Sequence, residues 1–234
     1  MSQYHLIIAI FEFAVLVFSL SLHEAAHAWT ANRLGDPTAR MLGRITLNPI
    51  KHIDIVGTII IPLVMLFIPG FGPFLIGWAK PTPVTPRNFK NITRDDILTT
   101  IAGPASNLFA AIVCFLLLIA FRAAGPAGFK SVVAAIYIAN GAQLSAALPT
   151  LFPLALILYL GLLLNLILAV FNLLPLPPLD GSHVIRHMLP FKALRIYDSL
   201  GIFSLIIILF IGGRVIGFFV SPALNFINAM LLSF

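Results

Sequence analysis

The chain has 234 residues, of which 60% are hydrophobic and only 9% are charged. Soluble domains carry about 25% charged residues, so this composition excludes an ordinary soluble protein and predicts several spans of a lipid bilayer. The net charge of +6 does not indicate a nucleic-acid-binding protein. The basic residues lie in the gaps between apolar runs, where they act as orientation signals instead of forming one basic stripe.

The first predicted span covers about residues 6–29. The preceding "MSQYH" lacks the basic residues of a signal peptide, and the apolar run is too long for one, so we expect this helix to be retained. The next apolar run, at about residues 53–80, is interrupted by "PGFGP". Interior prolines exclude a straight helix. We expect a re-entrant segment that contains a short helix, a turn and a short membrane-edge β element in "FLIGWAKP".

Two more core helices are predicted at about residues 97–121 and 151–174, and a last span at about 201–219 with an apolar tail after it. The weakly polar helical run at 131–148 has no clear placement. The predicted fold class is an all-α polytopic membrane protein with about four to six transmembrane helices. No hydrophilic gap is long enough for a second domain, so we expect residues 1–234 to form a single domain.

The basic residues also predict the orientation of the chain. If the N-terminus lies outside and residues 53–80 are re-entrant, all but Arg122, Lys130 and Arg214 fall on one side. If residues 53–78 crossed the membrane fully, Lys80 to Arg94 would face outward, and the basic residues would no longer gather on one side. Basic loops stay inside, so the protein is expected in the cell membrane with the following residues on its cytoplasmic side: Arg33, Arg40, Arg44, Lys51, Lys80, Arg87, Lys90, Arg94, Arg186, Lys192 and Arg195.

The motif "HEAAH" lies at the end of the first span. His23 and His27 stand at i and i+4 on one face of a helix, where both rings can bind one metal ion. Glu24 beside them can accept a proton from an activated water molecule. The alternative is a polar patch that joins helices, but it would leave Glu24 unneutralised where a charge is costly.

A catalytic zinc ion takes three protein ligands and leaves one position open. Asp180 is the best third candidate, because it follows an apolar span in "NLLPLPPLDGSH" at the same predicted depth as the two histidines. The prolines exclude a regular helix there, and Gly181 is expected to relax the backbone after the carboxylate. An isolated Asp-Gly pair is also typical of a surface turn.

Three motifs in this order resemble the site-2 protease family of intramembrane zinc metalloproteases: "HEAAH", "AGPASN" and "FNLLPLPPLDG". The segments "GRITLNPIKHIDIVGT" and "GWAKPTPV" resemble its small bacterial and archaeal branch without a PDZ domain. The resemblance implies one Zn²⁺ per chain, bound by His23, His27 and Asp180, with Glu24 as the general base.

The same resemblance implies that Asn172 contacts the substrate or stabilises the oxyanion, as an uncharged amide donor can. It implies that Asn107 serves mainly in close helix packing, and that "GWAKP" is an edge to which an unwound substrate pairs. The implied activity is hydrolysis of a transmembrane protein near the cytoplasmic leaflet. A membrane metal transporter or other metal-binding membrane protein is the alternative, and a non-proteolytic scaffold a weaker one.

Other polar residues have less defined roles. The pair His183 and His187 lacks a glutamate and predicts an interfacial basic helix, with His183 as a candidate contact behind the metal ligands. His52 and Asp54 are typical of a polar helix start. Glu12 shares the ligand face of the first helix, about 20° from His23 at ~100° per residue. We expect Glu12 to make structural hydrogen bonds. The alternative is a role in the access of water or in the path of the substrate.

Overall fold

The computed structural model describes residues 3–67, 77–142, 147–201, 203–204 and 211–233. Within these residues the protein is mostly helical, and four helices are long and apolar enough to span a membrane. The first two contain the predicted spans 6–29 and 97–121 and extend beyond them, whereas the third is slightly shorter than the predicted span 151–174. These four helices are α1 (Gln3–Leu34), α4 (Ile92–Ala123), α6 (Phe152–Asn172) and α10 (Gly213–Leu232).

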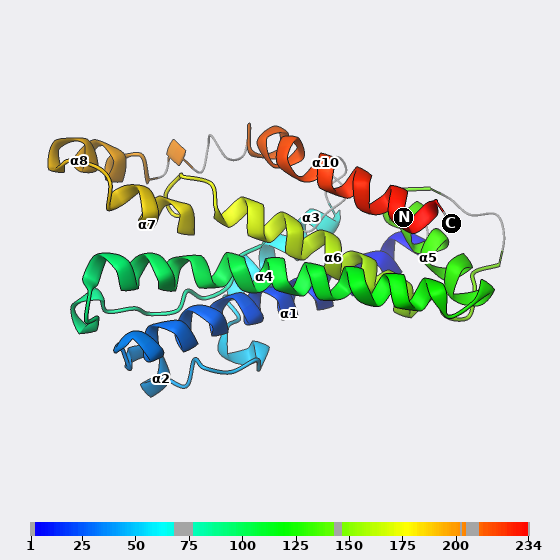
Figure 1. Ribbon diagram of the computed structural model, residues 1–234, viewed down its shortest axis with the longest axis horizontal. Coiled ribbons are helices and arrows are strands. Elements are labelled where there is room, and N and C mark those ends of the chain that lie inside the picture. Colours follow the sequence, from blue (N-terminus) through cyan, green and yellow to red (C-terminus); the bar gives the residue numbers. More distant parts are fainter. Residues whose placement is uncertain (1–2, 68–76, 143–146, 202, 205–210, 234) are drawn as a thin grey trace.

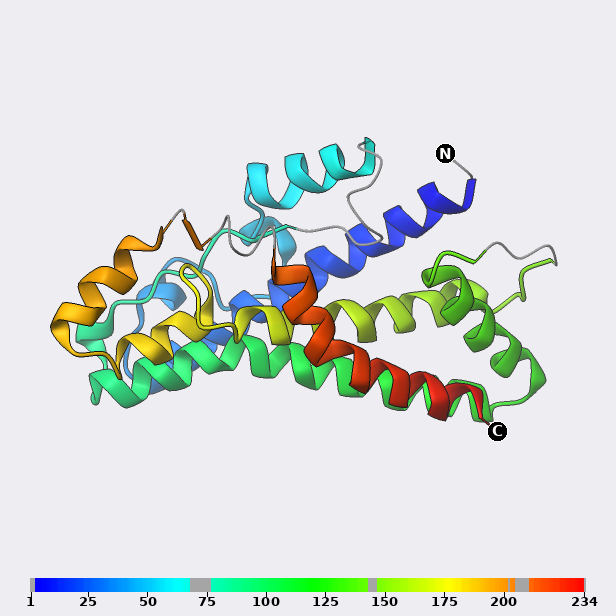
Figure 2. The ribbon, with the colours of Figure 1, turned by 90° about the horizontal axis from the view of Figure 1, so that it is seen from above.

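Helices α1, α4 and α6 lie side by side and form the centre of the molecule (Figures 1 and 2). Helix α4 runs antiparallel to the other two, and α10 packs mainly against α6. The interior between them is apolar and closely packed: Leu16 of α1, Leu118 of α4 and Leu156 of α6 are at most 2% exposed. Such packing, together with buried polar contacts, holds helices together inside a bilayer.

Shorter elements connect the long helices. The end of α1 and the start of α4 lie at the same end of the molecule (Figure 1). The short elements are α2 (Thr38–Met41), η1 (Pro49–Lys51), the π-helix η2 (Ile55–Ile60), α3 (Ile61–Phe67), η3 (Pro86–Asn88), α5 (Pro126–Ala139), α7 (Asp180–Arg186) and α8 (Phe191–Ser199).

The predicted membrane-edge β element is not observed as a strand. Residues 77–85 have no regular secondary structure, and the described part of the chain contains no strand. The segment is nevertheless held by backbone bonds, since the Trp78 and Lys80 amides donate to the Gly57 and His52 carbonyls. Prolines 81 and 83 cannot donate to a ladder, which is the physical reason that a regular strand does not continue. The predicted "PGFGP" turn lies outside the described residues.

The C-terminal region differs from the expected boundaries. The predicted last span, 201–219, lies partly outside the described residues, and the described helix α10 begins only at Gly213. Its continuation to Leu232 makes the expected apolar tail helical. A helix of 20 residues is long enough to cross the hydrocarbon core, whereas the part ending at Phe219 is not.

The outer surface of the helices is strongly apolar. Ile10 of α1, Phe109 and Leu116 of α4, and Phe218 of α10 are each more than half exposed. Soluble monomers rarely expose contiguous apolar surface on this scale. The surface therefore matches the expected environment of lipid chains around a multi-pass membrane protein.

Candidate metal centre

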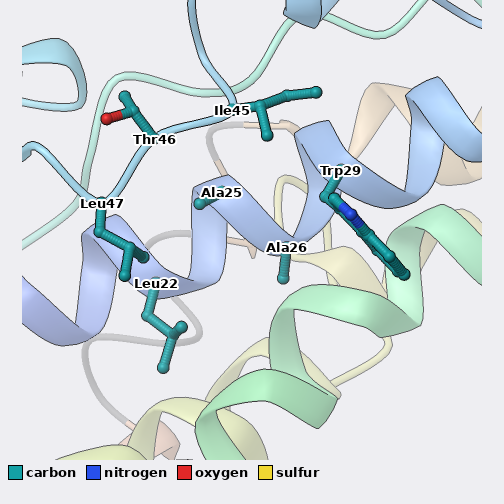
Figure 3. Close-up of a pocket in the computed structure, with 7 residues that line it drawn as sticks. All are labelled: Leu22, Ala25, Ala26, Trp29, Ile45, Thr46 and Leu47. Atoms are coloured by element: carbon teal, nitrogen blue, oxygen red, sulfur yellow. The ribbon is translucent and has the colours of Figure 1, made fainter.

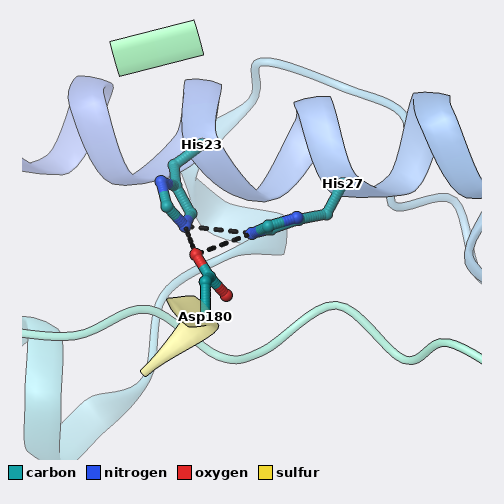
Figure 4. Close-up of side chains that lie close together, drawn as sticks. All are labelled: His23, His27 and Asp180. Carbon is teal, nitrogen blue, oxygen red and sulfur yellow. Dashed lines mark hydrogen bonds and ion pairs between the residues drawn. The ribbon is translucent and has the colours of Figure 1, made fainter. Parts of the chain in front are cut away.

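Three side chains converge where α1 meets the start of α7. His23 and His27 project from one face of α1, and their Nε2 atoms lie 3.0 Å apart. Asp180 is the first residue of α7, and its Oδ2 atom lies 3.0 Å from His23 Nε2 and 3.4 Å from His27 Nε2 (Figure 4). The predicted ligands, 153 residues apart along the chain between His27 and Asp180, are thus brought together.

The far side of each imidazole ring is held by a hydrogen bond. His23 Nδ1 lies 2.6 Å from Asn107 Oδ1, and His27 Nδ1 lies 2.7 Å from the Thr99 carbonyl oxygen. Both partners accept, so each Nδ1 carries the proton and each Nε2 turns a lone pair toward Asp180. The orientation of the Asn107 amide follows from its other contacts, because its Nδ2 donates to the Ser19 carbonyl and to Asn165 Oδ1.

The donor set fits a zinc ion. Two imidazole lone pairs and a carboxylate oxygen face one another, and Asp180 Oδ2 is buried without a hydrogen-bond donor. Tetrahedral ligands at zinc bond lengths would be ~3.3 Å apart, close to the separations of 3.0–3.4 Å seen here. The three atoms therefore form a candidate cation site.

Two glycines permit this close approach. Gly103 of α4 faces the histidine rings, and a Cβ atom at that position would lie 2.6 Å from His23 Nε2. A Cβ atom at Gly181 would lie 2.6 Å from the Leu174 carbonyl oxygen. Gly181 does not have a positive φ. The expectation that it relaxes the backbone is therefore wrong, and the glycine is required because α7 starts directly against the end of α6.

Helix α4 contributes a buried backbone carbonyl to the site. Pro104 lies inside this helix and has no amide hydrogen, so the Thr100 carbonyl four residues earlier lacks its helical donor. The neighbouring Thr99 carbonyl accepts from His27. The motif "AGPASN" thus supplies three things at once: a small residue at 103, a locally incomplete helix, and the Asn107 side chain.

A family model described as "Peptidase family M50" matches residues 11–212 of the chain. The chain belongs to this family, the site-2 protease family of zinc metalloproteases. The match includes the two histidines and Asp180, and also the three residues behind or against the rings: Thr99, Gly103 and Asn107. The predicted family and enzyme class are thereby confirmed.

Curated relatives of this M50 protease carry related names. A Bacillus subtilis protein named "Putative zinc metalloprotease YwhC" is 42% identical over 175 residues, which are 75% of this chain and 67% of that protein. "Putative zinc metalloprotease Rip2" of Mycolicibacterium smegmatis is 31% identical over 70% of this chain and 52% of its own length. The protein of the same name in Mycobacterium tuberculosis H37Rv is 28% identical over 212 residues, which are 88% of this chain and 65% of that protein. No solved structure matches the chain.

The two predicted catalytic residues of this M50 protease have different surroundings. Glu24 is half-buried, and its Oε2 atom accepts a hydrogen bond of 2.6 Å from the Thr82 backbone amide. Asn172 lies at the end of α6, and its Nδ2 donates to the Leu168 carbonyl one turn earlier. Its role toward substrate stays a prediction. Asn107 was expected to serve mainly in helix packing, but its Oδ1 accepts a hydrogen bond directly from His23, a predicted metal ligand.

Sequence reasoning missed three residues that support the site. Thr99 and Thr82 act through backbone groups, which side-chain chemistry does not reveal. Asn165 donates to the Ser19 hydroxyl and accepts from Asn107, so it connects α6 to the histidine shell. A signal for Asn165 did exist, because a lone amide in an apolar span is costly unless it has partners.

The remaining polar candidates lie away from the ligand atoms. His187 Nε2 and His183 Nδ1 face Asp96 Oδ2 at 2.7 and 3.7 Å, so these histidines pair with α4. Asp54 caps η2 by accepting from the Gly57 amide, which confirms the expected helix start, and His52 bonds to the Thr46 carbonyl. Glu12 is buried, at 4% exposure.

An apolar hollow on α1 is separate from the metal centre. It is bounded on the α1 side by Leu22, Ala25, Ala26 and Trp29 and on the other by residues 45–47 (Figure 3). These positions of α1 point away from the face that carries His23 and His27. The hollow contains none of the predicted site residues and opens on the apolar outer surface.

Proposed function

We propose that this M50 protease hydrolyses a peptide bond within or next to a transmembrane segment of a membrane protein, near the cytoplasmic leaflet. The observation that carries the proposal is the convergence of His23, His27 and Asp180, with Glu24 next to the first ligand on the same helix. These ligands lie on or next to helices apolar enough to cross a membrane.

In this proposal His23, His27 and Asp180 hold one Zn²⁺ per chain. Zinc bound there would supply a Lewis acid that polarises the scissile carbonyl and makes a water molecule more acidic. Glu24 accepts a proton from the attacking water and delivers it to the leaving amine nitrogen. Asn172 would turn from its own helix to donate a hydrogen bond to the developing oxyanion.

The proposed placement of the substrate follows from the path of the chain. The end of α1, the end of α6 and the start of α4 all lie in the same half of the molecule (Figure 1), and the basic loops there support a cytoplasmic position. Because α1 ends and α4 begins at this same end, the intervening segment, about 53–80, is proposed to be re-entrant. A substrate helix would have to become extended there, since a helix hides its peptide bonds.

The test combines zinc content with cleavage by the purified protein in lipid vesicles. The probes are tagged single-span segments with helix-breaking residues at different depths. Wild type should cut a probe and contain zinc, Glu24→Gln should keep zinc without cutting, and Asp180→Ala should lose both. Cleavage by Glu24→Gln at the wild-type rate, or a wild type without zinc, would refute the proposal.

A metal transporter is the competing hypothesis from another class. It would need a continuous polar path and several ion sites across the bilayer. Among the described residues, His23, His27 and Asp180 form the one group of three or more such side chains able to hold a metal ion. A single site and the family membership both favour the protease.

A further inference from the structure

The carboxylate of Glu24 is held by a segment that is distant in the chain. We propose that Thr82 is a positioning residue for Glu24, whose backbone amide orients the carboxylate for proton transfer. The inference rests on the proposed role of Glu24 as the general base, and it adds a residue whose removal should slow chemistry without removing zinc.

Two hydrogen bonds join this pair. The Thr82 amide donates to Glu24 Oε2 at 2.6 Å, and the Thr82 hydroxyl donates to the Glu24 backbone carbonyl at 3.0 Å. The first bond has the short length typical of a donor to an ionised carboxylate. Because the second bond holds the backbone of the same glutamate, both ends of the Glu24 residue are tied to one residue of the segment.

The position of the Thr82 amide is itself fixed from both sides. Before it, the Trp78 and Lys80 amides donate to the Gly57 and His52 carbonyls. After it, the Thr85 amide donates to Asp36 Oδ2 at 2.7 Å. The amides of residues 78, 80 and 82 each donate a hydrogen bond, so the segment that carries the donor to Glu24 is held at every second residue.

The flanking prolines make this donor specific. Pro81 and Pro83 have no amide hydrogen and a restricted φ angle, so Thr82 is the one residue of "PTP" with a backbone donor. The tripeptide is stiff and presents a single N–H group. A more mobile segment would hold the carboxylate over a range of positions.

The consequence concerns the two oxygens of the carboxylate. When Oε2 is engaged by Thr82, rotation of the group breaks a hydrogen bond, and Oε1 is left as the oxygen that exchanges the proton. Helix α1 fixes the Cα atom of Glu24 beside His23, but it does not fix the side-chain rotamer. Catalytic groups lose large factors in rate when such orientation is lost.

The kinetic test compares four variants with the wild type. Thr82→Pro deletes the amide donor and should lower kcat by about 10–100-fold, with KM within about twofold and zinc content unchanged. Thr82→Val keeps the amide and should lower kcat by only about 2–5-fold. Thr82→Ser keeps both donors and should restore wild-type kcat. Val84→Pro is the matched control, since it adds a proline to the segment and leaves the bonds to Glu24 intact.

A second measurement reports the contact without activity or metal. In zinc-free protein labelled with ¹⁵N-threonine, the Thr82 amide proton resonance, assigned by its loss in Thr82→Val, should lie downfield and move on Glu24→Gln. A Thr82 resonance that does not respond to Glu24→Gln would overturn the inference. Wild-type kcat in a folded, zinc-containing Thr82→Pro protein would overturn it as well.

The outcomes separate this inference from the proposed function. If Glu24→Gln cuts at the wild-type rate, the proposed general base is wrong. If Glu24→Gln is inactive and Thr82→Pro is fully active, only the positioning role fails. A Thr82→Pro effect on KM alone would assign Thr82 to substrate binding and would likewise refute the positioning role.

Discussion

At the scale of single residues, the centre depends on partners behind the ligands as much as on the ligands. Asn107 and Thr99 occupy the Nδ1 atoms of the two histidines, so each ring presents Nε2 to Asp180. An imidazole without such an acceptor can rotate or adopt the other tautomer. The free energy of metal binding is therefore expected to depend on the hydrogen bonds of the two Nδ1 atoms, which do not face Asp180.

Replacing Asn107 tests this contribution. Asn107→Leu removes the acceptor for His23 Nδ1–H and should weaken zinc binding by about 10–100-fold. Competition with a chromogenic chelator measures the change in affinity. Asn172→Ala is the control, because its amide contacts the Leu168 carbonyl and not a ligand, so it should retain zinc and lose kcat. Unchanged zinc affinity in Asn107→Leu would contradict the role of this bond.

Asp36 gives a prediction about pH. Burial alone would raise the pKa of this carboxyl group, but hydrogen bonds from Thr38, Thr85 and Asn88 hold it below its usual range. A carboxyl group with a lowered native pKa stabilises the fold above its unfolded pKa of about 3.9, and this contribution is lost as the pH falls below that value. Thermal unfolding in detergent should show a loss of stability on acidification through this window.

The Asp36→Asn variant is the comparison for that measurement. It cannot ionise, so it should be less stable at neutral pH and should lack this part of the acid dependence. Parallel curves for Asp36→Asn and wild type between pH 6 and 3 would show that the hydrogen bonds of Asp36 do not contribute as described.

At the scale of secondary-structure elements, the site depends on how closely α4 and α7 approach their neighbours. Gly103 lets α4 lie against the histidine rings, and Gly181 lets α7 start against the end of α6. The pairs of Asp96 with His183 and His187 then tie α7 to α4. A helix of only seven residues is marginal by itself, so these contacts place Asp180.

Adding one methyl group tests the α1–α4 approach. Gly103→Ala puts a Cβ atom 2.6 Å from His23 Nε2, so a ring or a helix must move, and zinc affinity should fall by at least about tenfold. Zinc titration and thermal unfolding measure the two effects. Gly213→Ala is the matched control in α10, where a Cβ atom would meet nothing within 4 Å. Equal zinc affinity in the two variants would contradict this account.

At the scale of the whole molecule, α1, α4 and the chain that follows α6 meet around one centre. The outer faces of the helices are apolar. Each long helix contains a stretch that is long and apolar enough to span the hydrocarbon core.

Cysteine labelling tests the orientation. In a Cys114→Ser background, which removes the single native cysteine, cysteines replacing the exposed residues Lys51 and Lys90 should react with a membrane-impermeant maleimide only from the cytoplasmic side. A cysteine replacing Lys130 of the opposite end should react only from outside. Labelling of the Lys51 and Lys90 positions from opposite sides would show that residues 53–80 cross the membrane completely.

Most of the candidate metal ligands could be predicted from the sequence alone. The spacing of His23 and His27 on a helix is a local property, as is the length of each apolar span, because both follow from the repeat of the helix. Asp180 was a prediction from composition and depth, and the structure brings it to the histidines.

Other features were decided only when the helices packed. Asn107, Thr99 and Thr82 reach the site from positions 58 to 84 residues away from their partners, and two of them contribute backbone groups that are not specific to threonine. The need for glycine at 103 and 181 is a matter of free space between elements. Local sequence sets which groups a helix can present, whereas contact between distant helices selects which of those groups meet.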